Sequence, residues 1–297
     1  MKRILNRKWA VIIGVLSGLL LTALTLWPTA PRSFLWEVIS PQGGRAYLLG
    51  SIHLASPSLY PLSESITGAF SRAGALVVEI NTEDMDPDLI GDFIKARGTA
   101  SDGRPLLERL TPETRDILNQ SGFYTDQLAS LTPWLAALAI QMAVLQQNGF
   151  EGRYGLDKHF IDLAHQRRLA ILELETLEEQ MGLLADMSEA EADLFLKAAV
   201  LEMAGLPGTI SDFIAAWQRG DAPGFARIFF REYDKYPELT PLMDKIIFRR
   251  SERMAARLDS LITKERALFV VVGAGHLVGP NNALTGLEAR GYTVSQL

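Results

Sequence analysis

The stretch Val270-Val-Val-Gly-Ala-Gly-His276 decides the fold, because it places a polar side chain at the end of a buried strand. The run from Ala267 to Val272 is apolar, rich in β-branched residues and too short for a typical helix. It therefore predicts an interior strand that is covered on both faces. Gly273 and Gly275 allow a sharp turn and leave space beside His276, at the carboxyl end of a strand, where open α/β sheets bind ligands.

The same pattern occurs more than two hundred residues earlier, in Tyr47-Leu-Leu-Gly-Ser-Ile-His53. Each stretch reads as an apolar strand followed by Gly-x-x-His and then Leu. The match predicts that the two ends of the chain meet in one sheet and bring His53 and His276 to the same edge.

The remaining patterns predict strands at both ends of the chain and helices between them. Further strands are expected at 34–39, 46–49, 75–78, 169–172 and 292–296. The strand–helix–strand order before Glu79 makes two strands parallel and puts His53 and Glu79 on one edge. Thr111, Thr132 and Thr240 each precede a proline and are expected to cap helices. The prediction is an α/β domain over 34–297, with a mixed sheet and a mostly helical insertion at about 86–262.

The first 33 residues predict a signal or membrane anchor with a linker. Four basic residues precede an uncharged apolar run from Ala10 to Trp27, and Pro28 and Pro31 follow it. The run is long enough to span a bilayer as an N-terminal membrane helix, and a cleavage site is unconvincing. We expect the domain to be anchored in the cytoplasmic membrane on the periplasmic side, or secreted if the segment is cut. A buried core helix is the alternative.

Composition and missing motifs exclude several classes of protein. The net charge is -6 and no basic run occurs beyond the first eight residues, which argues against nucleic acid as a partner. The chain has no cysteine, and hence no disulfide or thiolate nucleophile. It also has no Gly-x-Ser-x-Gly elbow, no phosphate-binding loop and no His-Glu-x-x-His helix.

His53, Glu79 and His276 are the candidate metal ligands, because all three follow predicted strands. Two imidazoles and a carboxylate are a common ligand set for a divalent metal with positions open to water and substrate. Such a metal suits amide or ester hydrolysis. The alternative for each histidine is a satisfied residue of the core or of a turn.

Other polar residues are assigned less specific roles. His159 and His165 lie six residues apart on a predicted helix and face different sides, so they cannot bind one metal as an i, i+4 pair. Asp157, Glu173 and Glu175 could act as a further ligand or a base, or could lie in caps and on the surface. Arg250 either belongs to a solvated helix face or supplies a fixed positive charge to a substrate or an oxyanion.

Taken together, these residues resemble the TraB/GumN family over Leu35 to Val294. The family is similar to the Tiki membrane-associated metalloproteases and belongs with the erythromycin-esterase and ChaN-like group. The motifs that carry the resemblance are Tyr47-Leu-Leu-Gly-Ser-Ile-His53, Leu76-Val-Val-Glu79, Gly155-Leu-Asp157, Leu174-Glu-Thr176 with Gln180, Arg250 with Met254-Ala255, and Val272-Gly-Ala-Gly-His276-Leu.

The resemblance implies a metal-dependent hydrolase site built from His53, Glu79 and His276, with Glu79 and Arg250 in the catalytic machinery. The Tiki branch uses manganese or cobalt, and zinc is also open here. Ser251 stands where the family usually has Asn, so a positioning contact is in question. We expect a peptidase-like enzyme of the cell envelope that acts on a peptide or small-molecule substrate. The alternative is a non-catalytic binding protein for a metal chelate, haem or peptide.

Overall fold

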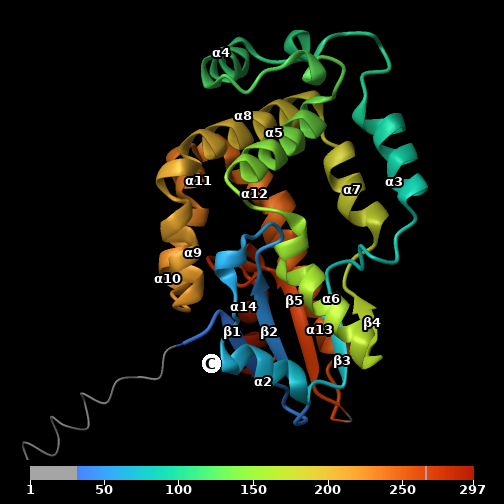
Figure 1. Ribbon diagram of the computed structural model, residues 1–297, viewed down its shortest axis with the longest axis vertical. Helices are drawn as coiled ribbons and strands as arrows, with labels where there is room; N and C mark the ends of the chain where they lie inside the picture. Colours follow the sequence, from blue (N-terminus) through green and yellow to red (C-terminus); the bar gives the residue numbers. More distant parts are fainter. Residues whose placement is uncertain (1–31, 265) are drawn as a thin grey trace, which may run out of the picture. The chain divides into compact units, whose positions relative to one another are not determined.

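A six-stranded mixed sheet in the order β4-β3-β5-β2-β1-β6 is the centre of the unit formed by residues 33–297 (Figure 1). The structure is a computed structural model that describes residues 32–264 and 266–297. The strands are β1 (Leu35–Ile39), β2 (Arg45–Ser51), β3 (Ala75–Val78), β4 (Ala170–Glu173), β5 (Leu268–Gly273) and β6 (Thr293–Gln296). The predicted meeting of the two chain ends in one sheet is confirmed, since β2 and β5 pair in parallel with Gly50 opposite Val272.

Strand β5 lies between β2 and β3 and is buried over its whole length, as its continuous apolar run predicts. The two strands that the sequence placed in one strand–helix–strand unit are therefore parallel but not neighbours. Strand β1 pairs antiparallel with both β2 and β6, which closes one side of the sheet. The carboxyl ends of β2, β3, β4 and β5 consequently lie on one edge.

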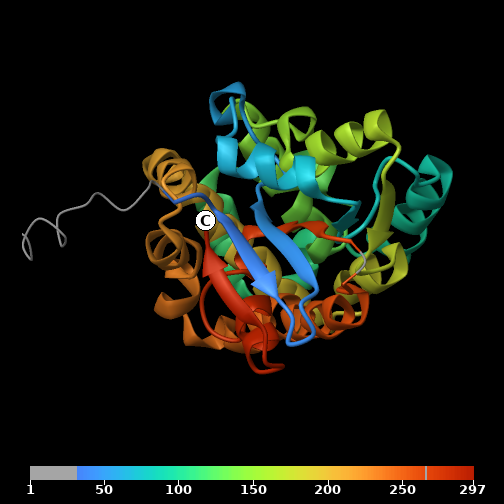
Figure 2. The same cartoon turned by 90° about the horizontal axis from the view of Figure 1, so that it is seen from below.

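Helices cover both faces of the sheet. Helices α2 (Glu64–Arg72) and α6 (Leu156–Arg167) lie on one face, and α13 (Arg249–Leu261) and α14 (Ala283–Glu288) lie on the other (Figure 2). The Ser63 side chain accepts a hydrogen bond from Ile66 N and caps the start of α2. The core between these layers includes Phe70, Phe160 and Phe269, whose rings pack against one another.

Residues 86–262 are mostly helical, as predicted, and their helices other than α6 and α13 form a roof over the carboxyl edge of the sheet (Figure 1). Helices α5 and α8 pack together around a second apolar core that includes Trp134, Ile140 and Leu196. The α-helices between 86 and 262, besides α6 and α13, are α3 (Pro87–Phe93), α4 (Pro112–Ser121), α5 (Pro133–Gln147), α7 (Leu177–Ala185), α8 (Glu189–Gly205), α9 (Ile210–Gln218), α10 (Ala222–Phe229), α11 (Arg231–Lys235) and α12 (Thr240–Met243).

The three predicted threonine caps have three different outcomes. Thr111 caps α4 through a hydrogen bond from Thr114 N. Thr132 occupies the cap position of α5, but its hydroxyl donates to Gly98 O instead of accepting from the helix. The prediction for Thr240 is wrong, because Thr240 is already in helical conformation and Leu239 precedes the helix. A short 3₁₀ turn at Pro237–Leu239 runs directly into α12 and replaces the expected cap.

The predicted N-terminal membrane helix lies outside the described residues. Within residues 32–264 and 266–297, no single helix is long and apolar enough to cross a membrane. Helices α8 and α9 meet the length and composition criteria only as a pair that bends by 87°.

Candidate metal and hydrolytic site

The candidate site lies where four parallel strands end. His53 follows β2, Glu79 follows β3, Glu175 follows β4, and His276 lies in the 3₁₀ turn Ala274–His276 after β5. Parallel strands end on the same side of a sheet, so these side chains meet although they are far apart in the chain. The structure thus brings together all three predicted metal ligands.

Gly273 lies at the centre of this group. A Cβ atom at Gly273 would lie 3.1 Å from His53 Nε2, 3.2 Å from Glu79 Oε1 and 3.6 Å from His276 Cδ2. Any side chain at this position would therefore fill the space that the three side chains surround. The glycine leaves a small cradle open there.

His276 is buried, and its ring is held by Ser251. The Ser251 hydroxyl donates to Ile247 O at 2.8 Å and lies 2.9 Å from His276 Nδ1. Because a hydroxyl has a single proton, Nδ1–H of His276 donates to Ser251 and the Nε2 lone pair points away. Burial lowers the pKa of His276 to about 4, so the ring is neutral at neutral pH. The replacement of the family's usual Asn by Ser251 had put a positioning contact in question. Ser251 makes such a contact, because it holds the ring of His276.

His53 has the opposite environment. Its Nδ1 lies 2.7 Å from Asp157 Oδ2, and its side chain is 59% exposed. Ser51 Oγ also donates to Asp157. The Asp157 carboxylate raises the pKa of His53 above its ordinary value despite partial desolvation of the ring. The hydrogen bond to Asp157 leaves Nε2 of His53 facing Gly273.

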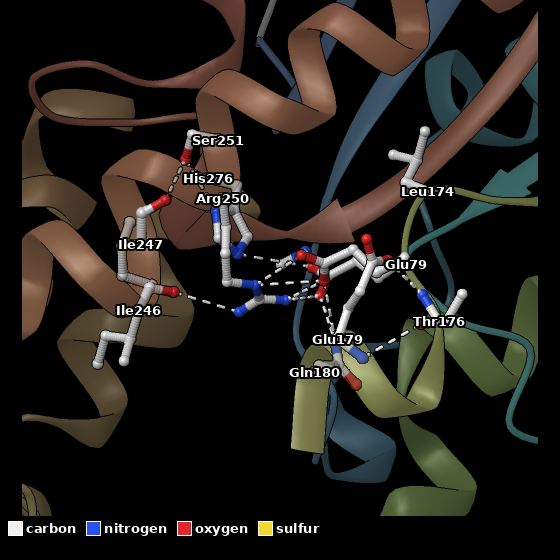
Figure 3. Close-up of polar contacts among 12 residues, drawn as sticks. Glu79, Leu174, Thr176, Glu179, Gln180, Ile246, Ile247, Arg250, Ser251 and His276 are labelled. Atoms are coloured by element: carbon white, nitrogen blue, oxygen red, sulfur yellow. Dashed lines mark hydrogen bonds and ion pairs between the residues drawn. The ribbon is translucent and has the colours of Figure 1, made fainter. Parts of the chain in front are cut away.

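Glu79 is a buried carboxylate that accepts hydrogen bonds on both oxygens. Oε1 accepts from Gly273 N at 2.6 Å, and Oε2 accepts from Arg250 Nη2 at 2.7 Å and Gln180 Nε2 at 3.1 Å (Figure 3). Burial favours the neutral acid, but the neighbouring imidazoles and the Arg250 guanidinium outweigh it and lower the pKa of Glu79 to about 2. Glu79 is therefore ionised at neutral pH.

Arg250 pairs with two carboxylates at once. Its Nε and Nη2 atoms lie 2.9 and 2.5 Å from the two oxygens of Glu175, and Nη2 also reaches Glu79 (Figure 3). A π-helix at Asp244–Phe248 leads into α13, and its Ile246 carbonyl accepts from Arg250 Nη1 at 3.3 Å. Such π-helices are frequent at functional sites. One guanidinium shared by Glu79 and Glu175 leaves an excess of negative charge beside two imidazoles.

The nitrogen and oxygen atoms of His53, Glu79 and His276 are donors that suit a divalent cation. Their spacing in this structure is wider than that of a bound metal site. Within residues 32–264 and 266–297, no group of three or more His, Cys, Asp or Glu side chains has the spacing of a metal site. The nearest approach between His276 Nε2 and Glu79 Oε1 is 3.9 Å. However, both imidazoles present Nε2 and bind a protein oxygen through Nδ1, which is the usual arrangement of metal-binding histidines.

The other two histidines lie outside the site. The His159 ring packs against Tyr60 and Phe160, with centroid distances of 5.1 Å in both cases, and burial lowers its pKa. His165 lies in the last turn of α6. Neither residue lines the cavity over the site.

Asp157, Glu175 and Gln180 all contact the site, although the sequence left Asp157 and Glu175 open between a site role and a cap or surface role and gave Gln180 no role of its own. Gly155 explains the position of Asp157, because a Cβ atom there would come within 2.1 Å of His53 O. This close approach sets the first turn of α6 against the end of β2. Glu175 and Gln180 flank the start of α7, and only the pairing of β4 with β3 brings them to Glu79.

A cavity of about 640 Å³ opens over the site. His53, Glu79, Arg250 and His276 line it at the carboxyl edge of the sheet, and helices of the insertion form its other walls. This volume is within the range of small-molecule and substrate pockets, which is roughly 300–1,000 Å³.

The fold and the site define an α/β protein whose histidine and carboxylate groups open into a pocket at the carboxyl edge of the sheet. The profile of the TraB/PrgY/gumN family matches residues 34–296, and the chain belongs to this family. The predicted resemblance is thereby confirmed.

Its relatives are distant. The chain is 24% identical to the uncharacterized protein YbaP of Escherichia coli over 169 residues, which cover 56% of this chain and 62% of YbaP. It is 22% identical to an uncharacterized protein of Treponema pallidum, with 86% of this chain and 80% of that protein aligned. It is also 22% identical to the metalloprotease TIKI2 of Danio rerio, over 89% of this chain and 60% of TIKI2. The chain thus spans less than two thirds of the length of YbaP and of TIKI2. No solved structure matches it significantly.

Proposed function

We propose that this chain is a metal-dependent hydrolase of the cell envelope that cleaves peptide or related amide bonds. The convergence of His53 Nε2, Glu79 Oε1 and His276 around Gly273 carries the proposal. Distant relatives that are named metalloproteases support it. We further propose that the basic and apolar N-terminal segment anchors the domain outside the cytoplasm.

His53, Glu79 and His276 would hold the cation. A divalent cation there, manganese, cobalt or zinc, would polarise a substrate carbonyl and promote the ionisation of water. Hydrolysis adds the water hydroxyl to the carbonyl carbon, breaks the carbon–nitrogen bond and leaves the proton on the amine. The pKa of Glu79 is lowered to about 2, so its carboxylate is ionised at neutral pH and would bind a cation without first losing a proton.

Arg250 helps to lower the pKa of Glu79 and holds both Glu79 and Glu175 in place. Its Nε and Nη2 donors are occupied by these carboxylates, and Nη1 donates to Ile246 O. It therefore orients the Glu79 carboxylate and offsets negative charge beside the reacting carbonyl.

Elemental analysis of the full-length chain tests the proposal. The protein should retain about one divalent ion per chain, and His53→Ala or His276→Ala should abolish that retention. His159→Ala is the matched control, because it removes an imidazole outside the site. Gly273→Ala should also lose the metal, whereas Gly91→Ala, on an exposed helix with open space around it, should keep it. Full metal content in a His53→Ala/His276→Ala double variant would sink the assignment.

A non-catalytic binding protein for a metal chelate, haem or peptide is the alternative, because the pocket could capture such a ligand without turning it over. Incubation with a peptide library and manganese or cobalt separates the two, since a binding protein gives saturation without product.

A further inference from the structure

The walls of the cavity are apolar and partly uncovered. Helices α5, α7, α9 and α10 contribute apolar side chains that line it and are only half-buried, among them Leu138, Leu184, Ile210, Phe213, Ile214 and Ile228. Apolar surface that the protein leaves uncovered is stabilised when an apolar ligand displaces water from it. The cavity therefore favours a hydrocarbon ligand next to the polar site.

The polar groups on these walls are mostly bound to the protein itself. Thr209 Oγ1 donates to Gly205 O at 3.2 Å, Gln180 donates to Glu79, and Arg231 Nε donates to Glu232 Oε1 at 3.1 Å. A peptide brings one N–H and one carbonyl group per residue, and each of these costs free energy if it is buried without a partner. An extended peptide would find few partners on these walls.

The sheet does not offer a strand for peptide binding either. Extended peptides commonly bind by adding a strand to an exposed sheet edge. The edge strands are β4 and β6, and none of their described residues lines the cavity. The catalytic groups lie instead at the ends of the strands.

Glu202 is a half-buried carboxyl on α8 that lines the cavity. Burial raises its pKa to about 7, although Gln141, Arg231 and Glu232 lie nearby. Arg231 and Glu232 also line the cavity, but they pair with each other.

We propose that the cavity holds a fatty acyl chain, so that the substrate is an N-acylated amine or peptide whose acyl carbonyl lies beside Gly273. This inference rests on the hydrolase function proposed above for the position of the reacting group. Hydrolysis breaks the acyl carbon–nitrogen bond, adds the water hydroxyl to the acyl carbon and leaves a proton on the amine. The products are a fatty acid and a free amine.

Binding of a homologous series to the full-length chain, freed of metal with a chelator, tests the inference. The probes are hexanoyl-, decanoyl- and tetradecanoyl-glycine, with an unacylated leucine peptide of similar size as the comparison. Each added methylene should lower Kd about fourfold until the cavity is full. A Kd that does not change with chain length, or equal binding of the leucine peptide, overturns the proposal.

Cavity-filling variants locate the chain. Leu138→Trp and Ile210→Trp each place a large ring in the cavity and should weaken decanoyl-glycine binding at least tenfold. Leu89→Trp is the matched control, because Leu89 is 62% exposed on α3 and does not line the cavity. Circular dichroism identifies a variant that fails to fold. The proposal is then tested by the other variant and by the chain-length series. Wild-type binding by both folded variants overturns the proposal.

The two proposals fail separately. If the metal-free chain shows no chain-length dependence but the protein as purified holds about one divalent ion, only the acyl-chain proposal fails. Chain-length dependence without metal retention removes only the hydrolase proposal and leaves an acyl-binding protein.

Discussion

The two Gly-x-x-His turns place their imidazoles at neighbouring strand ends but give them opposite environments. His53 is largely exposed and bound to the Asp157 carboxylate, which raises its pKa. His276 is buried and bound to the neutral Ser251 hydroxyl, and burial lowers its pKa to about 4. The same local sequence therefore fixes where a ring lies, while the partner on Nδ1 and the degree of burial fix its charge.

This difference has a consequence for cation binding. His276 is neutral and presents an Nε2 lone pair at neutral pH, whereas His53 must lose a proton when a cation arrives. One imidazole is thus ready for a cation, and the other makes binding depend on pH.

Arg250→Ala should have the largest effect, because it removes the guanidinium that pairs with both Glu79 and Glu175. Glu79 and Glu175 would stay buried without their partner, and the free energy of unfolding should fall by about 3–5 kcal/mol. Urea denaturation measures this change. Arg249→Ala is the control, since Arg249 is 69% exposed and its pair with Asp244 should contribute no more than about 1 kcal/mol. Equal losses in the two variants would contradict the role given to Arg250.

Asp157→Asn should make the two imidazoles more alike. The amide keeps a hydrogen-bonding group but removes the charge, so the pKa of His53 should fall while that of His276 stays low. Titration followed by ¹⁵N NMR of the imidazole rings measures both, with Asp162→Asn on the same helix as the control. Cation affinity should weaken about 10–100-fold, as is usual when the residue that orients a metal-binding histidine is changed. An unchanged His53 titration would mean that Asp157 does not set its charge.

Ser251→Ala acts on the other ring and should weaken cation affinity by about tenfold, the lower end of such effects. It leaves Nδ1–H of His276 buried without its hydroxyl partner, so the ring can turn or change tautomer. Calorimetric titration with manganese measures the affinity. Ser260→Ala, an exposed serine on the same helix, should bind as the wild type does. Wild-type affinity in Ser251→Ala would show that this contact does not position the ring.

The smallest effect is the pH dependence of stability without metal, which should have opposite signs for the two rings. His276 binds fewer protons in the folded protein than in the unfolded chain. Its contribution to the free energy of unfolding is therefore lost as pH falls from 6.5 towards about 4. His53 binds more protons in the folded protein than in the unfolded chain. Its contribution to the free energy of unfolding is therefore lost as pH rises above 6.5. Thermal unfolding of each His→Ala variant against the wild type, across both ranges, measures these slopes. Slopes of the same sign would contradict the comparison.

The part of the site that sequence alone predicts is the part that strand ends determine. Apolar runs that end in glycine fix β2 and β5, and their polar followers, His53 and His276, must meet once the strands pair in parallel. Glu79 follows from the same reasoning on β3. These predictions depend on short-range sequence patterns and on one rule, that parallel strands end at the same edge of a sheet.

The remaining contacts depend on packing between distant elements. Asp157 reaches His53 because Gly155 sets α6 against the backbone of β2, and Glu175 reaches Arg250 only through the pairing of β4 with β3. The cavity depends on how the helices of the insertion pack, and no periodic pattern encodes that. Thr240 shows the limit of local rules, since a preceding 3₁₀ turn overrides a good capping signal.

Anomalous diffraction from crystals grown with manganese is the most direct measurement of the central claim that both chain ends bind one cation. We expect a single strong peak beside Gly273, in contact with Nε2 of His53, Nε2 of His276 and Oε1 of Glu79. A peak bound to other residues, or density that touches only one of the two imidazoles, would contradict it.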